Sequence, residues 1–220
     1  MEKRTRGRQS AETSEQTRRT ILDAALRIFA RQGFEATGMR DIAVAAGTTH
    51  SLIRHHFGSK EGVWQAVVRA AFNEFLAALQ TSVEPMNTTS DEPAALLKCI
   101  VRAFLQVCAR TPEIVQLLMH EGTEQSSRLE YVMKQAAPLQ EIIDPLLPLV
   151  QQQGDLRQFD NKTFVLYLLT AGAAPFGLFA FSNQILQTNI LSEEQTQQHI
   201  NRILSTLFPI MTFSDIPQSL

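Results

Sequence analysis

The chain has 220 residues, 44% of them hydrophobic, and a formal net charge of only −2. Such a chain can bury a sizeable core and can hold one small and one larger domain. The charge is distributed unevenly, because residues 1–70 carry twelve Lys and Arg against seven Asp and Glu, whereas residues 71–220 carry eight against fifteen. The acidic part is excluded as a second nucleic-acid surface unless its charges segregate locally, so we assign it another task.

Residues 1–13 are predicted to form a basic, flexible arm. The segment Met1–Glu12 contains four basic residues and one glycine but almost no apolar side chains, so it cannot bury enough surface to fold alone. Two roles remain open for it: contact with DNA phosphates or the minor groove, and a solubilising tail.

Residues 14–62 are predicted to form a three-helix DNA-binding domain. Thr13 and Gln16 fit a capping box, after which apolar residues recur at helical spacing until Gly33 ends the run. This first helix supports the more informative stretch that follows it. Residues 63–82 continue the pattern as a helix that connects this domain to the rest of the chain.

The stretch 37–62, TGMRDIAVAAGTTHSLIRHHFGSKEG, has the spacing of a helix-turn-helix motif. The small Ala43 suits a close crossing of two short helices, and Gly47 suits the turn between them. Ile42 lies on the apolar face of the first helix and Ile53 on that of the second. Because each apolar face is narrow, it must be buried against the other helix and a third one.

The remaining side chains of the second motif helix are polar and rich in hydrogen-bond donors, with no acidic residue between Asp41 and Glu61. A solvated surface helix would alternate Glu and Lys instead, so we interpret this surface as fitting the major groove of DNA. Lys60, at the start of the next helix, is predicted to bind phosphate together with exposed backbone N–H groups. Leu52 either touches a thymine methyl or closes the core. The predicted DNA contacts are Thr37, Arg40, Thr48, Thr49, His50, Ser51, Arg54, His55 and Lys60.

At these residues the chain resembles the tetracycline-repressor (TetR) family of bacterial regulators. The resemblance covers roughly residues 18–68, including RRTILDAALRIFARQGF and HHFGSKEGVW, and it implies the same phosphate role for Lys60. Three positions depart from the family pattern: Gly38 replaces a capping hydroxyl, Arg54 replaces a common tyrosine, and Thr48 occupies a variable aliphatic turn position. These departures prevent the transfer of a particular operator sequence. They leave the motif itself intact.

Residues 83–220 are predicted to form a helical ligand-binding and dimerisation domain, which makes the whole chain all-α. The periodicity leaves open whether Pro138, Pro145 and Pro148 kink one helix or divide it. No strand or internal repeat is apparent.

The segment Phe164–Phe181 is 18 residues long and carries no charge, which reaches the lower bound for a membrane-spanning helix. It contains Pro175 and two glycines and lacks a flanking basic cluster. We therefore predict no membrane contact. An all-round apolar helix packs on its own subunit with one face and on a partner with the other, so we expect a homodimer through the last two helices.

The large apolar and aromatic side chains of this domain predict a pocket for a small molecule, with Arg102, Gln116 or His120 orienting a polar group of the ligand. For each residue taken alone, ordinary core packing remains the alternative; the family resemblance supports the existence of a pocket more than these residues do. The predicted lining is Arg102, Phe104, Gln116, Met119, His120, Tyr131, Phe164, Tyr167 and Phe176.

Catalysis, metal binding and cofactors are not expected. His55 and His56 point to different faces of a helix and have no Cys or carboxylate at metal-ligand spacing. His120 with Glu121 lacks the second histidine of a zinc-protease helix, and neither a nucleophile elbow nor a phosphate-binding glycine loop is present.

The N-terminus indicates a cytoplasmic protein, and the family resemblance implies a bacterial one that associates with the nucleoid when bound to DNA. Cys99 and Cys108 lie nine residues apart on one predicted helix, about 13 Å along its axis, which is too far for a disulfide. The N-terminus is charged and polar, so we expect no cleavable signal peptide.

These observations lead to one principal hypothesis and one alternative. The principal hypothesis is a homodimeric repressor that binds a palindromic operator and releases it when a small molecule enters the C-terminal domain. The alternative is a DNA-bound interaction protein whose C-terminal domain engages a protein partner. The sequence identifies neither the effector nor the operator.

Overall fold

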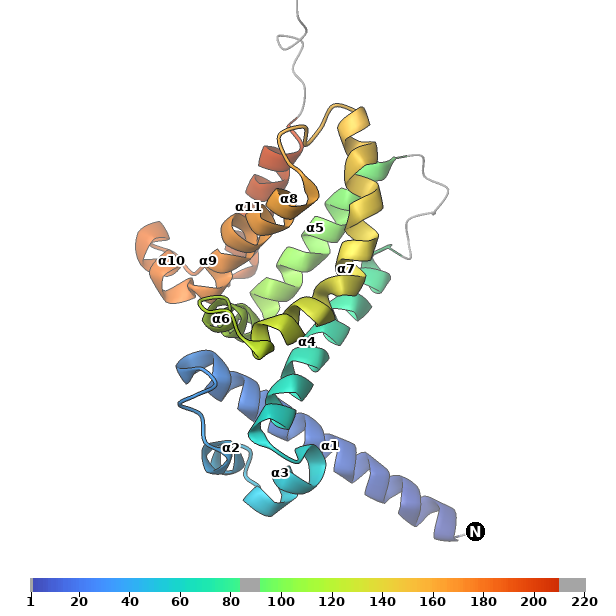
Figure 1. Ribbon diagram of the computed structural model, residues 1–220, viewed down its shortest axis with the longest axis vertical. Coiled ribbons are helices and arrows are strands. Elements are labelled where there is room, and N and C mark those ends of the chain that lie inside the picture. Colours follow the sequence, from blue (N-terminus) through green and yellow to red (C-terminus); the bar gives the residue numbers. More distant parts are fainter. Residues whose placement is uncertain (1, 84–91, 210–220) are drawn as a thin grey trace, which may run out of the picture. The chain divides into compact units, whose positions relative to one another are not determined.

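The computed structural model describes residues 2–83 and 92–209 of the chain, and all regular elements in these ranges are helices (Figure 1). This confirms the all-α fold class predicted from the sequence. In chain order the elements are α1 (Glu2–Gln32), α2 (Met39–Ala45), α3 (His50–Phe57), α4 (Lys60–Val83), α5 (Pro93–Arg110), α6 (Pro112–Glu121), α7 (Ser127–Gln152), α8 (Asn161–Tyr167), the π-helix η1 (Leu168–Ala173), α9 (Ala174–Gly177), α10 (Phe179–Leu186) and α11 (Glu193–Leu207).

The chain forms two compact units, each with its own hydrophobic core. Unit 1 comprises Met1–Asn73 and Gln116–Gln135, and unit 2 comprises Glu74–Val115 and Ala136–Leu220. The helices α4, α6 and α7 each contribute residues to both units. The chain therefore passes between the units inside helices, and three times rather than once.

These units differ from the predicted division at 14–62, 63–82 and 83–220. The end of α6 and the start of α7 belong to unit 1 because Leu117 and Val132 join the same apolar core as the helix-turn-helix. Contacts between segments so far apart in sequence leave no trace in local periodicity. The boundaries inside α4, α6 and α7 could not be read from the sequence for that reason.

The core of unit 1 gathers residues from each of its first four helices. Phe29 of α1, Ile42 of α2, Ile53 of α3 and Trp64 of α4 are at most 1% exposed. The apolar faces predicted for the two motif helices are therefore buried, as their spacing requires. This core holds α2 and α3 against α1.

The residues predicted as a flexible arm, 1–13, are part of the helix α1 from Glu2 onward. The helix α1 begins at Glu2 and runs through Thr13, which is therefore not an N-cap. The Thr13 carbonyl accepts a hydrogen bond from the Thr17 hydroxyl at 2.9 Å, within the helix. Arg, Gln, Glu and Ala are good helix formers, and extending an existing helix costs less than nucleating one.

The core of unit 2 is built mainly by α5, α7, α11 and the segment from α8 to α9. Leu105, Phe164 and Phe176 are fully buried in it. Gly172 allows η1 to lie close to α5, because a Cβ at this position would be only 2.8 Å from a terminal methyl carbon of Leu105. The ring of buried His199 contacts the Gly172 carbonyl oxygen through Nε2 at 2.9 Å and packs edge-on against Phe176.

The prolines of α7 do not divide it, which answers the question that the sequence left open. Pro138, Pro145 and Pro148 all lie inside the single helix Ser127–Gln152. Each proline removes one backbone donor from the helical ladder. The helix nevertheless persists, with Ile143, between the first two prolines, buried in the core of unit 2.

The charge-free segment is bent. The run Asn161–Gly177 meets α10 at an angle of 83°. No single helix in the described ranges is long and apolar enough to cross a membrane, although this bent pair meets the criteria of length and composition when its parts are taken together. Part of the segment, including Leu168 and Phe176, is buried in the core of unit 2.

Candidate nucleic-acid interface

The start of α3 is defined by the predicted Gly47 turn and by a cap at Thr49. Thr49 is its N-cap, with extended backbone angles (φ −101°, ψ 149°), and its hydroxyl accepts a hydrogen bond from the Leu52 N–H at 3.2 Å. Gly47 precedes it with φ +61°, a left-handed conformation that side chains other than glycine rarely adopt. The turn and the cap together fix where α3 starts relative to α2.

The outer face of α3 is polar and carries no acidic side chain. Thr49, His50, Ser51, Arg54 and His55 are exposed, as is the edge of Leu52 at 36%. Within the described ranges, no ion pair engages any of them. Donors on this face are thus available to an external partner, and Leu52 is available for apolar contact instead of closing the core. Thr48 is half-buried, at the edge of this surface.

The helix α2 begins with a cap that explains the departure at Gly38. The Asp41 carboxylate accepts a hydrogen bond from the Gly38 N–H at 3.1 Å, so an acidic side chain satisfies the backbone donor from inside the helix. A Cβ on residue 38 would lie 2.7 Å from the same carboxylate oxygen. Glycine leaves room for this cap, and Arg40 of the same turn is exposed.

Thr37 does not lie on the surface, contrary to the prediction that it contacts DNA. It is 2% exposed, and its hydroxyl donates to the Gly33 carbonyl at 2.7 Å. The Gln32 side-chain amide approaches the same hydroxyl at 3.4 Å. The hydroxyl therefore stabilises the connection between α1 and α2. The sequence alone suggested a DNA contact because Thr37 lies directly beside the motif.

Lys60 also has partners other than the predicted phosphate. Its Nζ donates to the Phe34 carbonyl at 2.9 Å and to the Glu35 carbonyl at 3.4 Å, and it lies 4.2 Å from the centre of the Phe34 ring. The ammonium is thus used to hold the connection between α1 and α2. At the start of α4, the Ser59 hydroxyl accepts from the Gly62 N–H at 3.0 Å.

The side chain of Phe34 is surrounded by aromatic and charged groups that the sequence did not reveal. Its ring stacks near Phe29 at 5.8 Å and meets Trp64 edge-on at 6.4 Å, measured between ring centres. The Arg128 guanidinium lies 4.1 Å from the same ring centre, slightly closer than the Lys60 ammonium at 4.2 Å. Phe34 is the residue at which the first helix, the fourth helix and the start of α7 meet within unit 1.

The nine residues predicted to line a ligand pocket are divided between the two units. Gln116, Met119, His120 and Tyr131 belong to unit 1, and the other five belong to unit 2. His120 Nε2 lies 3.1 Å from the Ala30 carbonyl, and Tyr131 packs against the ring of Trp64. In unit 2, Phe164 and Phe176 are core residues. Long apolar side chains that fill a core and those that line a cavity have the same sequence pattern.

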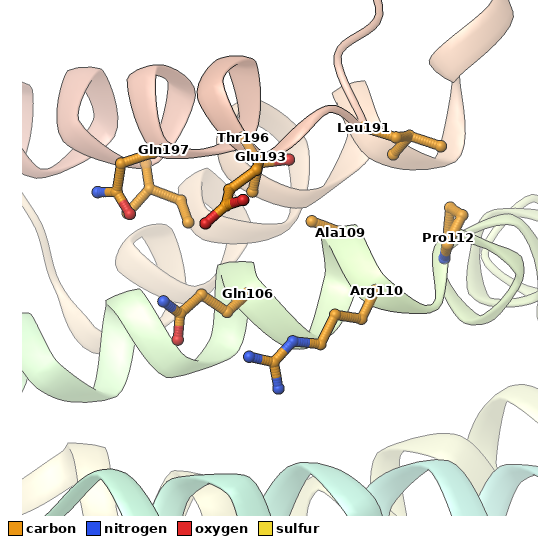
Figure 2. Close-up of a pocket in the computed structure, with 9 residues that line it drawn as sticks. Gln106, Ala109, Arg110, Pro112, Leu191, Glu193, Thr196 and Gln197 are labelled. Atoms are coloured by element: carbon orange, nitrogen blue, oxygen red, sulfur yellow. The ribbon is translucent and has the colours of Figure 1, made fainter.

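Unit 2 instead contains a pocket of about 610 Å³ between the end of α5 and the start of α11, which Figure 2 shows. None of the predicted residues lines it. Arg110 and Glu193 come from its two helices, and Ile200 is the buried residue among its lining. Its lining consists of Gln106, Ala109, Arg110, Pro112, Leu191, Glu193, Thr196, Gln197 and Ile200.

Comparisons with known proteins agree with the helix-turn-helix geometry. Residues 21–67 match the family model described as bacterial regulatory proteins, tetR family. The chain is 26% identical over 208 residues to the HTH-type transcriptional regulator RutR of Escherichia coli (strain K12), covering 91% of this chain and 94% of RutR. It is 27% identical over 171 residues to the HTH-type transcriptional repressor NicS of Pseudomonas putida, covering 76% and 77%. The chain belongs to the TetR family of transcriptional regulators.

Solved structures support the TetR-family fold over most of the chain. A crystal structure of AibR in complex with isovaleryl coenzyme A and operator DNA matches with a TM-score of 0.65 at 19% identity, covering 89% of this chain and 100% of AibR. A crystal structure of a HlyIIR mutant matches with a TM-score of 0.67 at 23% identity, covering 90% and 100%. At these identities the likeness concerns the fold alone. As a TetR-family member the chain is a regulator of transcription rather than an enzyme.

The cysteines of this TetR-family chain are not paired with each other. Both are free thiols, with Cys108 buried and Cys99 half-buried on α5. Burial raises the pKa of the Cys108 thiol to about 12, so it stays protonated and unreactive at neutral pH. Within residues 2–83 and 92–209, no three potential metal ligands come together.

Proposed function

We propose that this TetR-family protein is a homodimeric repressor that binds a palindromic operator through α3 and releases it when a small molecule binds unit 2. The observation that carries the proposal is the exposed, acid-free face of α3, held on a fully buried Ile53. The DNA contacts proposed are Arg40, Thr48, Thr49, His50, Ser51, Arg54 and His55. Thr37 and Lys60 are left out because the Thr37 hydroxyl and the Lys60 ammonium bind backbone carbonyls of the protein itself. Such a regulator acts in the cytoplasm, where bacterial DNA lies.

Unit 2 supports the dimer through large apolar side chains that remain exposed on the segment from α8 to α10. The apolar residues of α11, such as Ile203 and Leu207, are buried in the core of their own chain. We therefore propose that α8 to α10, more than α11, meets a second copy of the chain. A dimer of this kind presents two α3 helices about 34 Å apart, or at a multiple of that distance. The exposed residues are Leu166, Leu169, Leu178, Phe181, Ile185 and Leu186.

The pocket between α5 and α11 is the proposed effector site. Its volume lies in the range of small-molecule sites. One cation, Arg110, and one anion, Glu193, come from its two helices, and no ion pair joins them in the described structure. Figure 2 shows the Glu193 carboxylate extending toward α5 while the Arg110 guanidinium turns away from α11. A neutral polar or zwitterionic molecule suits this balance of one cation and one anion. A ligand with several phosphate groups does not, because the Glu193 carboxylate would repel its negative charges.

The mechanism needs a difference in affinity between two conformations of the protein. An effector that prefers the conformation in which the two α3 helices are wrongly spaced weakens operator binding about tenfold for each 1.4 kcal/mol of preference. NicS is named a repressor, and AibR has been solved with both a ligand and operator DNA. These relatives support the same type of regulation here.

A mobility-shift titration against fragments of the host genome, repeated at several salt concentrations, tests the proposal. We expect a palindromic site whose affinity falls steeply with salt, because Lys and Arg contacts to phosphates release counterions. Failure to find any preferred fragment, or an affinity that does not change with salt, would contradict DNA regulation by this chain.

A second candidate function is a DNA-bound protein that uses unit 2 to hold a protein partner. The exposed apolar side chains of α10 favour it, because such groups suit a protein surface as well as a second copy. Thermal-shift screening separates the two functions. A small molecule that stabilises the protein and also releases the operator supports the sensor, whereas stabilisation by no compound supports the interaction protein.

A further inference from the structure

We infer that Arg128 is a positioning residue for DNA binding, acting through Phe34 and Glu35 to hold the connection between α1 and α2. Arg128 lies at the start of α7, about ninety residues after the helix-turn-helix begins in sequence, yet it belongs to unit 1. The inference rests on the proposed operator binding. It adds a residue that does not touch DNA but determines how α2 and α3 are presented to it.

Three contacts place the Arg128 guanidinium. Its Nε donates to Glu121 at 3.0 Å, its Nη2 lies 3.2 Å from the Glu35 carboxylate, and its centre is 4.1 Å from the centre of the Phe34 ring. A guanidinium can make all three contacts at once, because it is planar, always charged and able to stack on an aromatic ring while its edge binds carboxylates. A lysine could not reproduce this set.

The two carboxylates have different roles in this arrangement. The Glu121 side chain is 6% exposed and the Arg128 side chain 20%, so their ion pair is largely removed from water. Glu121 thus orients the guanidinium. The Glu35 side chain is 82% exposed, so its ion pair with Arg128 is weak. Its contribution is to give Arg128 a second contact in the connection, at the residue next to Phe34.

Phe34 and Glu35 lie in the connection between α1 and α2, and they link Arg128 to the DNA-binding helices. Their carbonyls accept hydrogen bonds from the Lys60 ammonium. Two residues later, the Thr37 hydroxyl donates to the Gly33 carbonyl. The helix α2 starts at Met39, directly after this connection. Arg128 and Lys60 both contact this connection, and together they fix the direction in which α2 leaves α1. The helix α3 then follows α2 through the Gly47 turn.

The experiment compares operator affinity, thermal stability and the fluorescence of Trp64 in the full chain and its variants. Arg128→Ala should weaken operator binding about tenfold, because only the fraction of molecules with α2 and α3 correctly placed binds DNA. The slope of affinity against salt should stay unchanged, because every phosphate contact remains available. Lys134→Ala, an exposed cation on the same helix, is the matched control and should leave affinity unchanged.

A double variant separates positioning from simple loss of stability. Arg128→Ala leaves the Glu121 carboxylate buried without its partner, so the thermal midpoint should fall. Adding Glu121→Gln removes that charge and should restore most of the midpoint, but not operator affinity, because Phe34 and Glu35 remain unheld. Trp64 is the only tryptophan and is buried edge-on to Phe34, so its quenching by acrylamide should stay raised in both variants.

Three results would overturn the inference. Operator affinity of Arg128→Ala equal to that of the wild type means that Arg128 positions nothing. Recovery of both stability and affinity in the double variant assigns it a purely structural role. A lowered salt slope assigns it a direct phosphate contact. If the wild-type chain itself bound no DNA, the proposed function would fail first, and the inference would fail with it.

Discussion

The two units present different kinds of surface, although all regular elements of both are helices in residues 2–83 and 92–209. In unit 1 the exposed face of α3 is polar and ends in the cation Arg54, while the aromatic side chains around Phe34 and Trp64 lie inside. In unit 2 large apolar side chains such as Phe181 and Ile185 remain exposed on α10. Unit 1 therefore suits a charged partner and unit 2 an apolar one, so the two units differ in surface chemistry as well as in having separate cores.

The largest expected effect tests whether unit 2 has its own core and its own exposed interface. Phe176 is fully buried and Phe181 is 65% exposed, so the two phenylalanines form a matched pair. Phe176→Ala should lower the free energy of unfolding by about 3–5 kcal/mol, because it removes a packed ring from the core. Phe181→Ala should change it little but should weaken the dimer.

Urea unfolding followed by circular dichroism, together with sedimentation velocity, measures both effects. The distinction between core and interface would fail if Phe181→Ala destabilised the fold as much as Phe176→Ala. Unchanged association of the Phe181 variant would remove α10 from the proposed dimer contact.

The next effect concerns the polar face of unit 1. Arg54→Ala should weaken operator binding by about 1–3 kcal/mol for each base or phosphate contact that the arginine makes. Thermal stability should not fall, because Arg54 is exposed and makes no described ion pair. Arg69→Ala, an exposed arginine on α4, serves as the control. Equal losses of affinity in the two variants would mean that general charge, and not α3, accounts for DNA binding.

A smaller effect distinguishes a buried hydroxyl from an exposed one. Thr37→Val should lower the free energy of unfolding by about 0.5–1.5 kcal/mol, because the Gly33 carbonyl loses its donor. Ser51→Ala, on the exposed face of α3, should leave stability unchanged and reduce only operator affinity. Thermal unfolding and mobility shift on the same samples give both values. A Thr37 variant of unchanged stability but weaker DNA affinity would instead support a direct contact between Thr37 and DNA.

The smallest effect is a pH dependence confined to unit 2. Burial lowers the pKa of His199 below its ordinary value of 6.5, and the nearby charge of Arg202 lowers it further. Above this value both folded and unfolded chains hold the imidazole neutral. As the pH falls below about 6.5 the unfolded chain takes up the proton first, so stability decreases toward the folded pKa.

The variant His199→Gln keeps an N–H donor for the Gly172 carbonyl but does not titrate. Its free energy of unfolding should therefore fall less than that of the wild type between about pH 7 and 5.5. Urea unfolding at the two pH values measures the difference. Equal losses would show that His199 does not contribute.

The sequence predicted unit 1 better than unit 2 for a physical reason. The helix-turn-helix depends on spacings of a few residues, as between Gly47 and the α3 cap at Thr49, and such spacings are visible in one sequence. The roles of Thr37 and Lys60 depend on carbonyls of the α1–α2 connection, and the role of Arg128 depends on a helix some ninety residues later. Local periodicity contains none of these contacts.

In unit 2 the observed pocket is lined by residues other than the predicted ones, because burial decides between core and cavity and burial depends on the whole fold. Phe164 and Phe176 are of a residue type that often lines ligand sites, but here they fill the core. Gln106 and Glu193, which line the observed pocket, have nothing in their local sequence that predicts a ligand. The exposed apolar residues of α10 were expected as part of a dimer interface, and that part stays a prediction.

The salt dependence of binding to a footprinted operator tests the central claim most directly, because it measures the charged contacts of unit 1 and the pairing through unit 2 together. The account predicts two protected half-sites about 34 Å apart or at a multiple of that distance, two chains for each operator, and an affinity that falls steeply as salt rises. A single protected site bound by one chain would contradict the paired arrangement. An affinity independent of salt would contradict recognition of DNA by α3.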